Sequence, residues 1–117
     1  MTPQLAPSQF AAWRDAASTE ALPIVLDVRE PWERQTASVT ADGFTLLHIP
    51  MRELPARVNE LLATLGDAQP IACLCHHGVR SQQVATFLRQ NGFSDVVNLQ
   101  GGIAAWSQQI DPSIPQY

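Results

Sequence analysis

Four short runs of aliphatic and β-branched residues recur along the chain, and they constrain its fold more than any other feature. The runs are IVLDV at 24–28, LLHI at 46–49, IACLC at 71–75 and VVNL at 96–99. A continuous apolar run suits a strand that is covered on both faces, which is typical of a parallel sheet. Strands that alternate with helices join through crossovers, so the sequence predicts an α/β fold with a mostly parallel central sheet and helices on both faces.

Between these runs, apolar residues recur at helical spacing. The helical sets are Phe10, Trp13 and Ala17; Leu54, Val58, Leu61, Leu62 and Leu65; and Val84, Ala85 and Leu88. Gly66 and Gly92 follow the second and third sets, where a glycine can end a helix. Ser81 is predicted to cap the start of the third helix. Residues 36–45, TASVTADGFT, are rich in turn-forming residues and receive no assignment.

Length and composition favour one domain. A chain of 117 residues builds a single modest core, which we place at about 4–109, followed by a proline-broken tail at 110–117. The net charge is -4, and the seven arginines, with no lysine, form no basic cluster, so we expect no nucleic-acid partner. The apolar runs are too short to span a bilayer. The start of the chain lacks the charged and apolar regions of a secretion signal, so we expect a cytoplasmic protein.

The segment CHHGVRS at 75–81 carries the strongest chemical signal. Cys75 ends the third apolar run and a helix is predicted a few residues later, so the backbone N–H groups between them can curl around the sulfur. Gly78 lets the backbone turn with positive φ, and Arg80 supplies a permanent positive charge. The two histidines add hydrogen-bond donors. Such surroundings stabilise a thiolate and suit a nucleophilic cysteine that holds an anionic adduct.

Two other interpretations of this segment remain. It can be a plain strand-to-helix turn in which a cysteine ends the strand. It can also be a zinc site, since Cys73, Cys75, His76 and His77 are all able to bind a metal. Adjacent side chains rarely converge on one tetrahedral ion, and the sequence offers no separated second pair of ligands, so we expect neither a metal nor an organic cofactor. A disulfide between Cys73 and Cys75 would be strained by the single intervening residue.

Three segments together resemble the single-domain rhodaneses, a family of sulfurtransferases. They are LDVREPWE at 26–33, CHHGVRS at 75–81 and NLQGGIAAW at 98–106, in the expected order. The resemblance implies a compact α/β domain in which Cys75 takes sulfane sulfur from a donor such as thiosulfate, becomes a persulfide and passes the sulfur to a thiophilic acceptor. The loop that it implies as the cradle of the persulfide consists of His76, His77, Gly78, Val79 and Arg80.

The length of this loop argues against a related activity. Phosphatases and arsenate reductases of the same fold place five residues between the cysteine and the arginine, whereas four separate Cys75 from Arg80. The smaller ring fits a sulfur atom better than a tetrahedral phosphate. No general acid is evident either, because Asp95 lies in a loop beyond the following helix.

The chain departs from the family pattern in two places. Many relatives carry a Gly-His-Ile segment where this chain has TASVTADGFTLLHIP, which leaves donor and acceptor preference open. The loop also lacks the second basic residue that many thiosulfate-using relatives place beside the cysteine. With His76 and His77 there instead, we expect thiosulfate binding to be weak or dependent on pH.

Further polar residues lie at the same predicted rim of the sheet. Asp27 is expected to cap the turn that follows the first run, and Arg29 to pair with a carboxylate. The resemblance implies a supporting role for both, and we assign the same role to Ser81. Glu30 and Glu33 are expected to be solvated helix residues.

The remaining candidates favour packing over chemistry. Trp106 is expected to anchor the last helix, and the glycine pair at 101–102 to admit a close approach of backbone. Trp32 is a candidate for the lining of a pocket, and His48 for a packed residue of the rim. Cys73 is expected to be inert unless it faces the same pocket as Cys75.

The sequence therefore predicts a sulfurtransferase that moves sulfane sulfur from thiosulfate or a related donor to a thiol, cyanide or a protein thiol through Cys75. The alternative is a non-enzymatic module of the same fold that carries sulfur or docks a partner. The physiological donor, the acceptor and the oligomeric state are left open.

Overall fold

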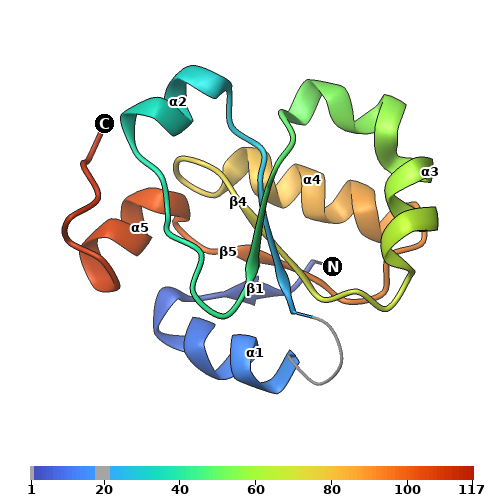
Figure 1. The fold of residues 1–117 in the computed structure, drawn as a ribbon, viewed down its shortest axis with the longest axis horizontal. Coiled ribbons are helices and arrows are strands. Elements are labelled where there is room, and N and C mark those ends of the chain that lie inside the picture. Colours follow the sequence, from blue (N-terminus) through green and yellow to red (C-terminus); the bar gives the residue numbers. More distant parts are fainter. Residues whose placement is uncertain (1, 18–21) are drawn as a thin grey trace.

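The computed structural model describes residues 2–17 and 22–117, and it shows a central sheet enclosed by helices (Figure 1). The strands are β1 (Gln4–Leu5), β2 (Ile24–Asp27), β3 (Thr45–His48), β4 (Ile71–Leu74) and β5 (Val96–Leu99). The helices are α1 (Phe10–Ala17), α2 (Pro31–Thr36), α3 (Leu54–Leu65), α4 (Val79–Gln90) and α5 (Gly102–Gln109). Short 3₁₀ turns, η1 (Pro7–Gln9) and η2 (Met51–Glu53), lead into α1 and α3.

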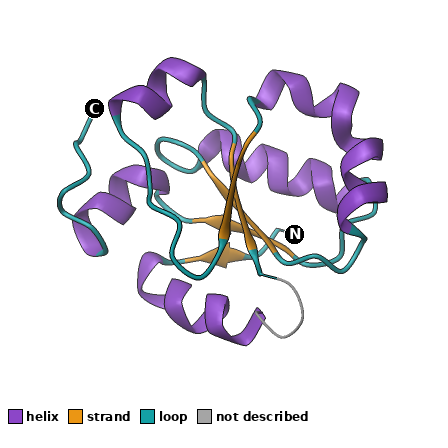
Figure 2. Ribbon diagram, viewed as in Figure 1, coloured by secondary structure: helices purple, strands orange, loops and turns teal. Residues whose placement is uncertain are grey.

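The sheet has the order β1-β5-β4-β2-β3, and each neighbouring pair is parallel (Figure 2). The four aliphatic runs form β2 to β5, so the predicted α/β fold is confirmed. The strand β1 was missed by sequence reasoning. It is only two residues long, and it is placed by pairing with β5, where the N–H of Asn98 donates to the carbonyl of Pro3 at 2.9 Å.

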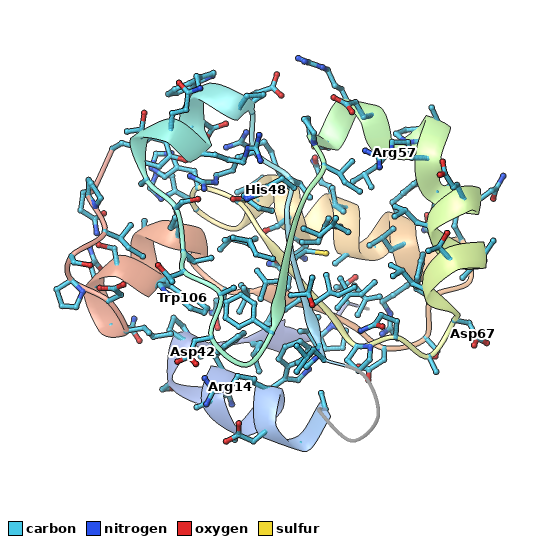
Figure 3. The ribbon with its side chains drawn as sticks, in the orientation of Figure 1. Arg14, Asp42, His48, Arg57, Asp67 and Trp106 are labelled. Carbon is cyan, nitrogen blue, oxygen red and sulfur yellow. The ribbon has the colours of Figure 1, made fainter. Side chains whose placement is uncertain are left out.

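Two separate apolar layers cover the sheet, as predicted. Helices α3 and α4 pack on one face, on the sheet side chains that include Cys73 and Cys75. Helices α1 and α5 pack on the other face. There the ring centroid of Trp106, labelled in Figure 3, lies 4.6 Å from that of Phe10. The expected role of Trp106 as the anchor of the last helix is confirmed.

Helix α4 begins earlier than predicted. Its N-cap is Gly78 in the left-handed conformation, with φ of 100°, and Ser81 lies inside the first turn. The prediction that Ser81 caps the helix was wrong, because the glycine reverses the backbone and the helix starts directly after it. The other end is as expected: Gly92 has φ of 111°, and the N–H of Phe93 donates to the carbonyl of Leu88 at 3.1 Å.

Two segments without regular structure complete the core. In the turn-rich stretch at 36–45, the buried side chains belong to Ala37, Val39 and Phe44. In the tail, Ile114 is buried, and its carbonyl accepts a hydrogen bond from the hydroxyl of Ser107 at 2.6 Å. The tail thereby carries Tyr117 back to α2 (Figure 1). Within the residues described, no helix combines the length and apolar character needed to cross a membrane.

Candidate functional site

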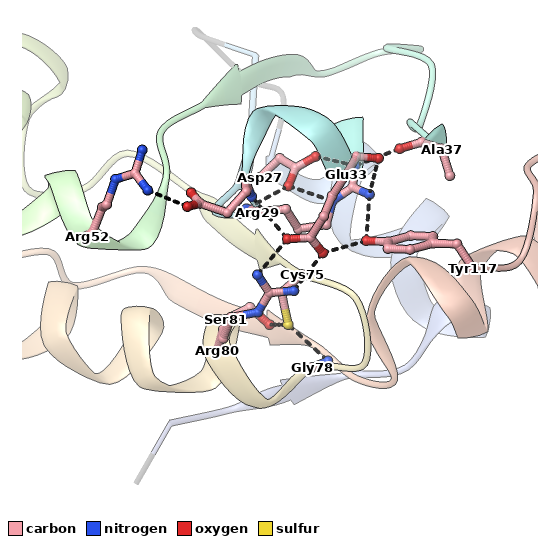
Figure 4. A network of polar contacts seen from close by, with 11 residues as sticks. Asp27, Arg29, Glu33, Ala37, Arg52, Cys75, Gly78, Arg80, Ser81 and Tyr117 are labelled. Atoms are coloured by element: carbon pink, nitrogen blue, oxygen red, sulfur yellow. Dashed lines mark hydrogen bonds and ion pairs between the residues drawn. The ribbon is translucent and has the colours of Figure 1, made fainter. Parts of the chain in front are cut away.

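Cys75 follows β4 at the carboxyl end of the sheet, and two groups able to donate hydrogen bonds lie beside its sulfur (Figure 4). The N–H of Gly78 donates to Sγ at 3.0 Å, and the hydroxyl of Ser81 lies 3.2 Å from it. The side chain is 1% exposed. A buried sulfur with N–H and O–H donors aimed at it is better solvated as an anion than a sulfur in a purely apolar core.

The loop after Cys75 turns its carbonyl groups toward α5. The carbonyl of Cys75 accepts from the N–H of Ile103 at 2.8 Å, and that of His76 accepts from Ala104 at 3.1 Å. Because a trans peptide directs its N–H opposite to its C=O, the next two N–H groups point away from α5. Among the described residues no acceptor binds these two groups, or the N–H groups of Val79 and Arg80. Four backbone donors of this loop are therefore available to an anion.

Close backbone approach holds the loop on α5. A Cβ atom on Gly102, where φ is 62°, would lie 2.5 Å from the carbonyl oxygens of both Cys75 and His76. The packing role expected for the glycine pair is thus confirmed for Gly102, and it acts directly on the cysteine loop.

Asn98, which sequence reasoning missed, ties the loop to β5. Its Oδ1 lies 2.6 Å from the hydroxyl of Ser81, and its Nδ2 donates to the carbonyl of Gly78 at 3.1 Å and to Gln4 at 2.9 Å. The single proton of the Ser81 hydroxyl therefore serves either Asn98 or the sulfur of Cys75. The only signal in the sequence was a polar residue in the middle of an aliphatic run.

Asp27 and Arg29 form a fully buried ion pair, so Arg29 pairs with a carboxylate as expected. Arg29 donates from Nε and Nη2 to the Asp27 carboxylate at 2.9 and 2.7 Å. Its other donors reach the carbonyls of Glu33 and Ala37 and the hydroxyl of Tyr117. Every N–H of the guanidinium is thereby occupied. Through these hydrogen bonds the ion pair connects the end of β2 to α2 and to Tyr117 in the tail.

Glu33 is 3% exposed, so the prediction that it is solvated was wrong. Its carboxylate receives two hydrogen bonds from Arg80, at 2.7 and 2.8 Å, and one from the hydroxyl of Tyr117 at 2.7 Å. The hydrogen bonds from Arg80 are the main cause that lowers the pKa of Glu33 to about 2. The pKa of Arg80 is raised chiefly by Glu33. Both terminal nitrogens of the Arg80 guanidinium therefore donate to a carboxylate of the protein itself. Glu30, in contrast, is half-buried and pairs with Arg52.

Acid should destabilise the fold through Glu33. Its pKa lies below the ordinary value of 4.5, so its stabilising contribution is complete above pH 4.5 and is lost as the pH falls toward 2. We expect the free energy of unfolding to fall over this range, and to fall less in Glu33→Gln. Urea titrations of both proteins across these pH values measure the difference. Parallel pH profiles would contradict the assignment.

A stack of three rings covers one side of the loop. The ring of His76 lies between those of His77 and Tyr117, with centroid distances of 3.9 and 3.8 Å. Burial lowers the pKa of His76, as does the neighbouring His77, so neutral His76 is favoured near pH 7. The ring centroid of Trp32 lies 6.1 Å from that of Tyr117. Because Trp32 is 62% exposed, it borders the site and does not line a pocket around the sulfur.

Comparison with known proteins decides the family. The model of the rhodanese-like domain matches residues 7–109, which is most of the chain. The chain belongs to the rhodanese-like domain family. Its curated relatives include the Rhodanese-like/PpiC domain-containing protein 12, chloroplastic, of Arabidopsis thaliana, 40% identical over 93 residues that make up 80% of this chain and 30% of that protein. The chain thus spans less than a third of that relative.

Other members of the rhodanese-like family match over a larger share of their own length. A protein of Allochromatium vinosum named sulfurtransferase is 32% identical over 91 residues, which cover 78% of each chain. The crystal structure of a rhodanese-related protein from Thermoplasma volcanium superimposes with a TM-score of 0.71 at 28% identity, covering 98% of this chain and 99% of the other. The relatives of this chain thus include a protein named sulfurtransferase.

Three features of this rhodanese-like domain bear on the residues and alternatives raised by the sequence. Burial raises the pKa of Cys73 strongly, and its side chain is 0% exposed. Within the described part of the chain, no three His, Cys, Asp or Glu side chains are grouped as metal ligands would be. His48 lies at the rim as expected, with Nδ1 3.6 Å from the Asp27 carboxylate, and burial lowers its pKa.

Proposed function

We propose that the protein is a sulfurtransferase that carries sulfane sulfur as a persulfide on Cys75. The observation that supports this most is the pair of donors on its sulfur, the N–H of Gly78 and the hydroxyl of Ser81. A persulfide extends the cysteine by one sulfur atom, and its charge then reaches loop N–H groups that have no acceptor among the described residues. Preorganised donors of this kind stabilise the charge of an adduct without rearrangement.

In the first half-reaction the thiolate of Cys75 attacks the outer sulfur of a sulfane donor. With thiosulfate, the new S–S bond forms as the donor's own S–S bond breaks, and sulfite leaves with the bonding electrons. The cysteine keeps one sulfur atom and one negative charge. The step needs neither an external oxidant nor a reductant.

In the second half-reaction a thiophile attacks the outer sulfur of the persulfide. A thiol, a protein thiol or cyanide takes that sulfur, and the Cys75 thiolate departs. Because each half-reaction ends with a stable enzyme form, the kinetics are ping-pong. In this proposal Gly78, Val79, Arg80 and the two histidines shape the loop, while Asp27, at the end of β2, and Arg29, just after it, support the loop.

Intact-protein mass spectrometry after incubation with sulfane donors tests this proposal. We expect a gain of one sulfur atom that maps to the peptide containing Cys75 and is removed by cyanide. Thiosulfate and an organic hydropersulfide are tried separately. If neither donor adds sulfur, the proposal is wrong and the domain acts as a partner-binding module. Uptake without release to any small thiol or cyanide would identify a sulfur carrier instead.

Ser81→Ala should slow sulfur transfer about tenfold, because one hydrogen bond to an anionic sulfur is worth roughly 1.5 kcal/mol. The substitution also leaves the buried Oδ1 of Asn98 without its partner at 2.6 Å, so the thermal midpoint should fall as well. Steady-state transfer from a sulfane donor to cyanide measures the rate, and Ser113→Ala, an exposed serine in the tail, is the control. An unchanged rate would remove Ser81 from the proposed site.

A further inference from the structure

The charges around Cys75 are already balanced within the protein. Arg29 is paired with Asp27, and Arg80 with Glu33 (Figure 4). Both carboxylates are buried, with exposed fractions of 0% and 3%. The two arginines at this site therefore offer no uncompensated positive charge to an incoming anion.

A dianion such as thiosulfate gains more from an uncompensated cation than a monoanion does. Arg80 gives Glu33 two of its five N–H groups, so the others can still reach an anion, but to act as an uncompensated counter-ion its guanidinium has to leave Glu33. The buried carboxylate would then keep only the hydrogen bonds from Tyr117 and from the N–H of Glu30. Leaving a buried charge without its ion-pair partner is strongly unfavourable.

We infer that Glu33 sets the donor class, because it occupies Arg80 and so favours an organic hydropersulfide, R–S–SH, over thiosulfate. The inference rests on the sulfurtransferase function proposed above. A hydropersulfide brings at most one negative charge to its reacting end. The N–H groups of the loop that have no acceptor in the described part of the chain can donate hydrogen bonds to that charge without Arg80. Glu33 is a specificity residue that acts through Arg80.

The step balances without a co-reactant. The Cys75 thiolate attacks the outer sulfur of R–S–SH, and a new S–S bond forms. The donor's S–S bond breaks, and its electron pair leaves with the inner sulfur as the thiolate R–S⁻. The outer sulfur and its proton end on the cysteine as Cys75–S–SH, so one negative charge is present before and after.

The ratio of kcat/KM for thiosulfate to kcat/KM for cysteine hydropersulfide tests the inference. Glu33→Gln keeps the shape of the side chain but leaves Arg80 uncompensated, so we expect this ratio to rise about tenfold over wild type. Glu30→Gln is the matched control. It makes the same change in net charge on the same turn, but Glu30 pairs with Arg52 and not with Arg80, so the ratio should stay within about twofold.

The double variant Glu33→Gln/Arg80→Gln should lose the gain, because the gain requires the released guanidinium. A ratio that does not rise in Glu33→Gln would overturn the inference, as would an equal rise in Glu30→Gln. Transfer of sulfur from neither donor to Cys75 would instead remove the proposed function itself.

A measurement on the wild-type protein does not depend on how the variants fold. Sulfate is an unreactive dianion with the same tetrahedral centre and charge as thiosulfate. We expect it to inhibit hydropersulfide turnover no more than sodium chloride at matched ionic strength. Competitive inhibition by millimolar sulfate beyond the chloride control would show an available cation beside the sulfur and would overturn the inference.

Discussion

Cys75→Ala is expected to reduce sulfur transfer to the background rate, a loss of at least about a thousandfold. The sulfur of Cys75 is the atom that forms and breaks every covalent bond of the proposed cycle, and alanine cannot replace it. Transfer to cyanide from thiosulfate and from a hydropersulfide, followed as thiocyanate, measures the loss. Intact mass in the presence of donor should show no added sulfur.

Cys73→Ala is the matched control, because it removes the other thiol of the same strand end. Both cysteines lie on the same face of the sheet, and the exposed fraction of each is at most 1%. Each substitution therefore leaves a cavity of similar size, at a cost of roughly 1 kcal/mol. Burial raises the pKa of the Cys73 thiol, so it stays protonated, and we expect its variant to keep most of the activity. Equal loss in the two variants would contradict the choice of nucleophile.

The sequence was sufficient for the sheet and for the centre of the site because both are encoded locally. The aliphatic runs are continuous, so their burial on both faces could be read without any tertiary information. The motif at 75–81 places a cysteine, a glycine and an arginine within one loop, where the chain itself brings them together. The short strand β1 has no such pattern. Only its pairing with β5 in the folded structure identifies it as a strand.

The contacts around the site were harder to predict from the sequence, because they join residues that lie far apart in the chain. Tyr117 is 84 residues from Glu33, and Arg80 is 47 residues from it. A glutamate on a short polar helix is solvated in most proteins, and nothing near Glu33 in sequence indicates that an arginine and a tyrosine cover it. The polar residue Asn98 inside an aliphatic run was a visible signal, because a buried amide requires partners.

Local reasoning about the start of α4 failed for a related reason. Ser81 has the chemistry of a helix cap, but the structure uses that hydroxyl on the sulfur of Cys75 and on Asn98. Gly78 caps the helix instead, through its backbone conformation alone. A side chain that can cap a helix is therefore weak evidence for a helix start when it lies next to a reactive group.

Gly102→Ala is expected to destabilise the protein by about 3 kcal/mol and to reduce sulfur transfer more than tenfold. A left-handed conformation alone costs a non-glycine residue roughly 1 kcal/mol. At this position the new Cβ would also lie 2.5 Å from the carbonyl oxygens of Cys75 and His76. Because these atoms are backbone, relief requires the cysteine loop to move off α5. That movement would shift the N–H of Gly78, which donates to the sulfur, and the other N–H groups of the loop.

Gly43→Ala separates the steric effect from the conformational one. Its φ of 74° is close to the 62° of Gly102, but its Cβ would meet the side chain of Arg14, a flexible group that can move aside. We expect it to cost about 1 kcal/mol and to leave sulfur transfer unchanged. Urea unfolding gives the free energies, and the rate of transfer to cyanide gives the activity. If the two variants were alike in both measurements, the contact between α5 and the cysteine loop would not position the sulfur.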